Sequence, residues 1–289
     1  MKFGVLTLGP VLCWVSACGQ APTTAAGKVD GNVVYGTVNG TELHLDVYEA
    51  AAGGGSHPAV VLIHGGGWTS NDKSTMLGMG EFLARHGFVG FAVDYRLFQD
   101  GKNGWPAQLD DVQRAVRWIR ANASTYGATA DRMGAFGHSA GGQLAALLGM
   151  EDTRDNSDPA LAKFSSRVQA VVDVSGPSDF TTDHDADASA FLARFLGATY
   201  SAHPEVWREA SPALRAARGD APFLIVHGTE DQDVPMSQSQ ELLDKLKAAG
   251  VEASLVKVND EHTFKTPAAR RELALQSLAF FSHNLAGAQ

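Results

Sequence analysis

Ser139 is surrounded by residues whose types and spacing indicate nucleophilic chemistry, since residues 137–142 read Gly-His-Ser-Ala-Gly-Gly. A short apolar run at 133–136 precedes it, and good helix formers follow it at 143–148. The serine is therefore predicted to lie on a sharp strand-to-helix turn, whose backbone angles cost little only for glycine. Such a turn can expose a catalytic serine, but the stretch alone also fits a packing turn whose serine caps a helix.

A second glycine-rich stretch could supply the hydrogen-bond donors that stabilise a developing oxyanion. It reads His-Gly-Gly-Gly-Trp at 64–68 and follows a continuous apolar run at 59–63. Glycines let backbone N–H groups approach a substrate closely. A loop of this kind could also cradle a phosphate, but it lacks the Lys-Ser/Thr ending of a phosphate-binding loop. We therefore predict an oxyanion hole formed by Gly66, Gly67 and Ala140, the residue after the serine.

An acid and a base are expected at the ends of strands later in the chain. The apolar run at 223–226 ends in an acidic turn that contains Glu230, Asp231 and Asp233, and sites in open α/β sheets gather at such strand ends. Of the ten histidines, His262 alone lies between the last strand pattern and the last helical pattern. A loop histidine is commonly just solvated, but the chain order serine, acid, histidine is typical of hydrolases with this kind of nucleophile turn. We predict His262 as the general base and a carboxylate of the acidic turn as its orienting group.

The elements that must position these residues alternate along the chain. Eight strands are predicted, over 32–38, 42–48, 59–63, 88–93, 133–136, 168–174, 223–226 and 254–258. Helical periodicity predicts helices over 76–86, 106–126, 139–149, 236–249 and 267–285. This order predicts an α/β fold with a mostly parallel eight-stranded sheet and helices on both faces. The segment from about 178 to 217 breaks the alternation, and we expect a small helical insertion over one end of the sheet.

Several aromatic residues near these motifs could contact a substrate. We name Trp68, Phe98 and Trp105 as candidate substrate-binding residues, with Phe191 and Phe195 of the insertion beside them. Large apolar rings also contribute much of an ordinary core. The sequence leaves both interpretations open.

The N-terminus has the composition of an export signal. A lysine precedes a mostly apolar stretch that is too short to span a bilayer, and small residues precede Cys18. This stretch resembles a bacterial lipoprotein signal, which implies removal of residues 1–17, lipidation of Cys18 and, with no aspartate at position 19, an outer-membrane location. A flexible tether is expected at 18–31 and the folded domain at 32–289. The alternative is a buried N-terminal helix with an incidental cysteine.

The overall composition narrows the possible partners. The 289 residues are 44% hydrophobic and 19% charged, which is typical of a globular protein with a core. A net charge of −9 without a basic block argues against nucleic acid and against electrostatic docking on anionic lipid. We therefore expect a small-molecule substrate, and membrane contact only through the N-terminal lipid anchor.

Taken together, the motifs resemble those of α/β-hydrolases, in the branch of hormone-sensitive-lipase-like and bacterial acetyl or feruloyl esterases. The matching stretches are HGGGW at 64–68, VDYR at 93–96, GHSAGG at 137–142, HGTEDQDVP at 227–235 and EHTF at 261–264. The resemblance implies the α/β-hydrolase fold and a catalytic triad of Ser139, Asp231 and His262. Asp231 is preferred because the resembling families place their carboxylate three residues before Val234.

The resemblance further implies a serine carboxylesterase that hydrolyses short-chain or aryl carboxylic esters through an acyl-enzyme, with no metal and no organic cofactor. One alternative is an arylformamidase or exopeptidase that acts on an amide bond. A second alternative is a non-catalytic binding lipoprotein that keeps the fold.

Overall fold

The fold opens with an antiparallel hairpin in a computed structural model that describes residues 29–51, 55–182 and 186–285. Strands β1 (Val29–Val38) and β2 (Thr41–Tyr48) are joined through Asn39 and Gly40, which both have the positive φ of a tight hairpin turn. β1 begins earlier than predicted, because Val29 already pairs with Tyr48. The prediction of a tether over 18–31 is therefore wrong for its last three residues, while the signal segment and Cys18 lie outside the described residues.

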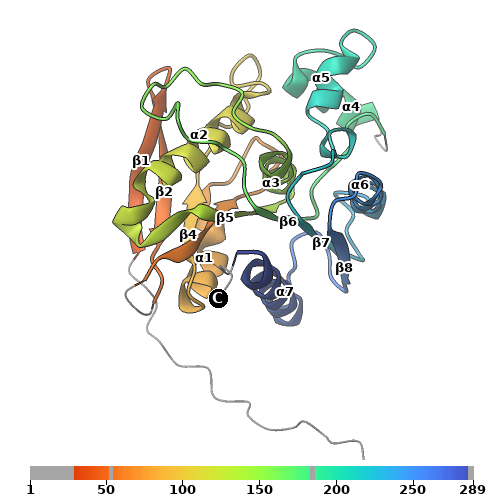
Figure 1. Cartoon of the computed structure of the whole chain (residues 1–289). Helices are drawn as coiled ribbons and strands as arrows, with labels where there is room; N and C mark the ends of the chain where they lie inside the picture. The colour runs from red at the N-terminus through yellow and green to blue at the C-terminus, as the bar shows by residue number, and fades with distance from the viewer. Residues whose placement is uncertain (1–28, 52–54, 183–185, 286–289) are drawn as a thin grey trace, which may run out of the picture.

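One eight-stranded sheet organises the described chain, in the order β1-β2-β4-β3-β5-β6-β7-β8 (Figure 1). The later strands are β3 (His57–Ile63), β4 (Val89–Val93), β5 (Ala128–His138), β6 (Ala170–Val174), β7 (Phe223–Gly228) and β8 (Ala253–Val258). β2 pairs antiparallel with both of its neighbours, and the pairs from β4 to β8 are parallel. The prediction of a mostly parallel eight-stranded sheet is confirmed.

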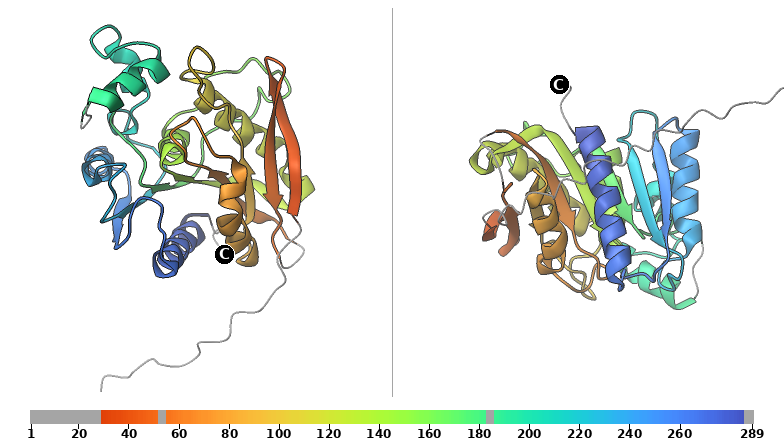
Figure 2. Two further views of the ribbon diagram at one scale, coloured as in Figure 1. Left: turned by 180° about the vertical axis from the view of Figure 1, so that it is seen from behind. Right: turned by 90° about the horizontal axis from the view of Figure 1, so that it is seen from below.

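Helices cover both faces of the sheet, as the apolar strand runs predict. The main helices are α1 (Leu77–Arg85), α2 (Ala107–Asn122), α3 (Ala140–Met150), α6 (Met236–Ala248) and α7 (Pro267–Leu285). Side chains of α2, α3 and α6 share one core with Val61 and Ile63 of β3, whereas α1 and α7 share the other with Val60 and Leu62. Within the described ranges no helix has both the length and the apolarity to cross a bilayer. Figure 2 shows α1 and α7 side by side on their face.

The predicted insertion consists of short helices at one end of the sheet (Figure 1). Its elements are α4 (Ala186–Leu196), α5 (Pro204–Glu209) and the 3₁₀ turn η3 (Pro212–Leu214). Hydrogen bonds fasten the insertion to the main domain. Phe195 O accepts from Trp105 N (2.9 Å), Ala210 O accepts from Gln143 Nε2 (2.9 Å), and Ser178 N donates to Gln238 Oε1 (2.8 Å). The insertion is thus tied to α3, the helix that follows Ser139.

Arg96, in the loop after β4, is held by a buried ion pair with Asp111 of α2. The guanidinium donates from Nε and Nη2 at 2.8 Å, and the backbone N–H of Arg96 donates to the same carboxylate at 2.8 Å. Only 1% of the Asp111 side chain is exposed. Burial raises the pKa of this carboxyl above its usual value even though the guanidinium opposes the shift. The pair therefore fixes the loop after β4 against α2 at a high desolvation cost.

We expect Asp111→Ala to lower the free energy of unfolding by about 3 kcal/mol or more, because it leaves a buried guanidinium unpaired. Asp100→Ala is the matched control, since Asp100 pairs with Arg194 at 3.5 Å where both side chains are largely exposed. Its cost should stay below about 1 kcal/mol. Urea denaturation of both variants tests this, and equal losses would contradict the assigned role of the buried pair.

Candidate active site

Ser139 occupies the turn between β5 and α3 in a strained backbone conformation, with φ 56° and ψ −121°. A residue with a side chain in such a region costs about 1–3 kcal/mol, and the surroundings must hold it there. Ser139 N donates to Val174 O of β6 at 2.8 Å, while Ser139 O accepts from Gly142 N (2.8 Å) and Gln143 N (3.2 Å). The neighbouring strand and the first turn of α3 thus hold the half-buried serine on the strand-to-helix turn that the sequence predicts.

The glycines around the serine are required by close backbone approach. A Cβ at Gly137 would lie 2.0 Å from Gly141 O, and a Cβ at Gly141 would lie 2.2 Å from Ile63 O. Real Cβ atoms do not tolerate such distances, so any larger residue would open the turn. The Gly-x-Ser-x-Gly spacing follows from packing the elbow against the end of β3.

The loop after β3 brings the predicted oxyanion donors beside the serine. Gly66 has φ +119°, and its carbonyl is turned away to accept from Thr69 N (3.0 Å) and Ser70 N (3.1 Å). Gly66, Gly67 and Ala140 all line the same cavity as Ser139. Ala140 opens α3, so its N–H has no partner inside the helix. The partial positive charge of that helix end favours an oxyanion here.

Asp231 and His262 meet although 31 residues separate them along the chain. Nδ1 of His262 lies 2.6 Å from Oδ2 of Asp231. The other oxygen, Oδ1, accepts from the backbone N–H groups of Asp233 and Val234, each at 2.9 Å. The Asp231 side chain is fully buried, whereas Asp233 is exposed. The geometry therefore selects Asp231 of the three carboxylates in the acidic turn.

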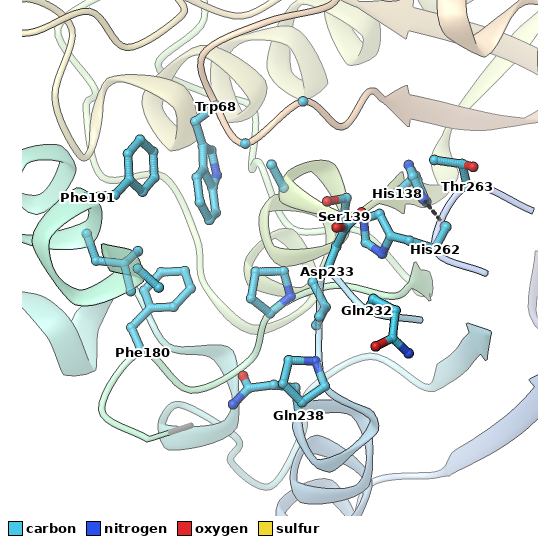
Figure 3. A pocket seen from close by; sticks show the side chains of 18 of the residues that line it. Trp68, His138, Ser139, Phe180, Phe191, Gln232, Asp233, Gln238, His262 and Thr263 are labelled. Atoms are coloured by element: carbon cyan, nitrogen blue, oxygen red, sulfur yellow. Dashed lines mark hydrogen bonds between the residues drawn. The ribbon is translucent and has the colours of Figure 1, made fainter. Parts of the chain in front are cut away.

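Ser139 and His262 face one cavity of about 580 Å³ (Figure 3). His262 comes from the loop between β8 and α7, and Ser139 from the elbow between β5 and α3. Because these loops lie at the carboxyl ends of parallel strands, the sheet itself brings the serine and the histidine to one edge.

His227, at the end of β7, is a supporting residue that our sequence reasoning did not assign. Its Nε2 lies 3.0 Å from Val234 O and 3.3 Å from Oδ2 of Asp231, so this nitrogen carries the proton. Its Nδ1 then accepts from Ser239 Oγ at 2.6 Å. Burial opposes ionisation of Asp231, but the hydrogen bonds from His227 and His262 hold the pKa of its carboxyl well below its usual range. The signal that could have identified His227 is its place in the HGTED stretch.

His138, directly before the serine, supports the base from the other side. Its Nε2 donates to the backbone carbonyl of His262 at 2.8 Å, and the two ring centroids lie 4.9 Å apart. Burial lowers the pKa of His138 to about 4, so the ring is neutral near pH 7. The residue before the nucleophile therefore holds the loop that carries the base. Its adjacency to Ser139 was the available sequence signal.

Aromatic side chains form the cavity wall opposite the acidic turn (Figure 3). Trp68, Phe180 and Phe191 line it, and Trp68 Nε1 donates to Gln143 Oε1 at 3.2 Å. Trp68 thus lines the cavity that Ser139 faces, and its contact with substrate stays a prediction. Phe98 and Trp105, the other two candidates, do not line the cavity. Each ring packs edge-on against Phe195, so the core interpretation fits both residues.

The described residues contain no cluster of three or more His, Cys, Asp or Glu side chains arranged to hold a metal ion.

The BD-FAE family model matches residues 45–246. The probable carboxylic ester hydrolase LipM of Mycobacterium tuberculosis is 31% identical over 225 residues, 75% of this chain and 52% of LipM. The carboxylesterase NlhH of the same species is 30% identical over 227 residues, 74% of this chain and 68% of NlhH. The chain thus spans about half the length of LipM and about two thirds of NlhH.

Among solved structures, the butyrate-bound esterase Est2 of Thermogutta terrifontis superposes with a TM-score of 0.77 at 25% identity. The match covers 93% of this chain and 98% of Est2. The α/β-hydrolase fold that the motifs predicted is therefore confirmed.

We expect Asp231→Asn to lower kcat by about 10⁴, because an amide in this position favours the wrong tautomer of the base. Asp233→Asn is the matched control two residues away. It should retain most activity, because the exposed Asp233 side chain makes no hydrogen bond to His262 among the described residues. Steady-state kinetics on an ester substrate decide the matter, and a collapse confined to Asp233→Asn would refute the assignment.

Proposed function

We propose that this chain, which belongs to the BD-FAE family of α/β-hydrolases, is a serine carboxylesterase acting on short-chain or aryl carboxylic esters. The observation that carries the proposal is the 2.6 Å contact between His262 Nδ1 and the buried Asp231, because His262 lines the same cavity as Ser139. Three similarities support the same reaction class. The chain belongs to this family, its relatives LipM and NlhH are named as carboxylic ester hydrolases, and its structural neighbour Est2 is an esterase.

In the proposed reaction, Ser139 Oγ attacks the ester carbonyl while His262 Nε2 takes its proton. The buried Asp231 carboxylate holds the Nδ1–H tautomer and stabilises the imidazolium that forms. The N–H groups of Gly66, Gly67 and Ala140 stabilise the tetrahedral oxyanion. His262 then protonates the leaving alcohol. A water molecule, deprotonated by the same histidine, releases the acid from the acyl-enzyme and regenerates the serine.

The cavity supports a compact, weakly polar substrate. One wall is formed by Trp68, Phe180 and Phe191, and Leu192 lies beside them. The rings that back this wall, such as Phe195 at 4.7 Å from the Trp68 ring, leave it well packed. Est2 is described with butyrate bound, which supports a short acyl group here as well.

We expect the wild type to hydrolyse p-nitrophenyl acetate and butyrate faster than p-nitroacetanilide or N-formylkynurenine. Ser139→Ala should lower kcat on the esters by at least about a thousandfold, because the remaining site has no nucleophile. A fluorophosphonate probe should label the wild type and not the variant. Faster turnover of the amides would identify an amidase instead, and an unlabelled, inactive wild type would indicate a binding protein.

We further propose that the enzyme is exported and tethered by lipid on Cys18, with the outer membrane as its location. The proposal rests on the sequence alone: an apolar N-terminal stretch, small residues before Cys18 and no aspartate at position 19. The net charge of −9 disfavours electrostatic membrane docking, so a lipid anchor would have to supply the attachment.

We expect Cys18→Ser to leave the ester kcat unchanged and to move the protein out of the membrane fraction. Cys13→Ser is the matched control, because Cys13 lies within the segment that would be removed. Fractionation of cells that express each full-length variant tests this. Membrane association of Cys18→Ser at the wild-type level would refute the lipid anchor.

A further inference from the structure

A second cavity, of about 730 Å³, lies on the face of the sheet that α1 and α7 cover. We call it the α1–α7 cavity. The two helices run side by side there, as Figure 2 shows, and both contribute to its wall. The active-site cavity, at about 580 Å³, is smaller. The α1–α7 cavity therefore has room for a small organic molecule.

The floor of the α1–α7 cavity is apolar. Met76, Phe136, Phe264 and Leu273 line it, and each is at most 8% exposed. Phe136 comes from β5, at the centre of the sheet, so the floor reaches the core of this face. Such a surface binds a hydrocarbon chain or ring by removing apolar area from water.

Three arginines, Arg85, Arg270 and Arg271, line the same cavity, and no aspartate or glutamate does. The charge of this cavity wall is opposite in sign to that of the whole chain, which has 32 acidic and 23 basic residues. An apolar floor combined with guanidinium groups is complementary to a molecule that has an apolar part and an anionic head.

The arginines keep donors for a ligand. Arg85 pairs with Glu81 at 2.5 Å, and Arg270 Nη2 donates to Lys265 O at 2.5 Å. The guanidinium of Arg271 makes no hydrogen bond or ion pair with the described part of the chain. Arg270 and Arg271 lie close to the N-terminus of α7, where the helix dipole disfavours cations. Helix stability therefore does not account for their position.

The α1–α7 cavity also adjoins the active site. Asn71, His138 and Thr263 line both cavities, so these three residues form the partition between them. His138 is the side chain that holds the backbone of the base. A ligand in the α1–α7 cavity would thus lie against the partition that supports His262.

We infer that the α1–α7 cavity binds a carboxylate with an apolar tail, the tail on the apolar floor and the carboxylate at Arg270 and Arg271. A carboxylate accepts paired N–H groups from a guanidinium, which is the geometry that arginine offers. This site lies outside the proposed catalytic site and does not depend on ester hydrolysis. The proposed reaction also releases a carboxylate, but the short acyl group proposed at Ser139 distinguishes that product from the longer acid inferred here.

The test is isothermal titration of decanoate into the full chain carrying Ser139→Ala, which separates binding from turnover. Gly78 lines the α1–α7 cavity, and a Cβ added there would meet no heavy atom within 4 Å. Gly78→Leu adds an apolar side chain to this wall and should weaken decanoate binding by roughly tenfold or more, because the tail loses room on the apolar floor. Gly78→Ala is the matched control and should bind almost as the parent does.

The charge is tested with Arg270→Gln/Arg271→Gln, which should weaken decanoate binding by roughly tenfold, as two partly exposed charge pairs would. Decyltrimethylammonium, with the same tail and the opposite charge, should bind the parent more weakly than decanoate. Circular dichroism checks that each variant is folded. The inference is overturned if decanoate does not bind the parent. It is also overturned if Gly78→Leu and the double arginine variant bind decanoate like the parent.

Discussion

The strained backbone of Ser139 is the constraint on which the rest of the site depends. The φ of 56° at Ser139 is maintained by hydrogen bonds with β6 and the first turn of α3. Close backbone packing against the end of β3 also holds the turn in place. That packing admits only glycine at 137 and 141. It also places the start of α3 directly after the serine, where the positive end of the helix dipole favours an oxyanion. Nucleophile and oxyanion donors are therefore positioned by one piece of backbone packing.

The buried carboxylate of Asp231 is the second costly feature, and its cost is offset locally. An ionised group without exposed area must be matched by hydrogen bonds. Two backbone N–H groups donate hydrogen bonds to Oδ1 of Asp231, while ring nitrogens of His227 and His262 contact Oδ2. His227 cannot replace His262 as the base, because Val234 and Ser239 occupy its two ring nitrogens. The network thus leaves one histidine available for catalysis.

The active-site cavity lies at the carboxyl edge of the sheet and the α1–α7 cavity lies on the face that α1 and α7 cover, so different elements line the two cavities. The helical insertion lies over the active site and supplies aromatic side chains from α4. On the face that α1 and α7 cover, these helices line an apolar cavity whose wall contains arginines and no carboxylate. His138 lies between the two, with its ring on the loop of the base. Asn71 and Thr263 also separate the two cavities, but among the three residues it is the His138 side chain that is hydrogen-bonded to the backbone of the base.

The sequence by itself determined the parts of this protein that rest on local chemistry. The elbow could be predicted from glycines flanking Ser139, and the parallel sheet from continuous apolar runs, since both depend on neighbouring residues. The tertiary structure decided what depends on distant contacts. The acidic turn by itself left three carboxylates open and only the family resemblance favoured Asp231. The structure shows the physical reason, because the Asp231 side chain contacts His262, 31 residues away. It placed Phe98 and Trp105 behind the wall, since Phe195, from a distant segment, packs against both rings.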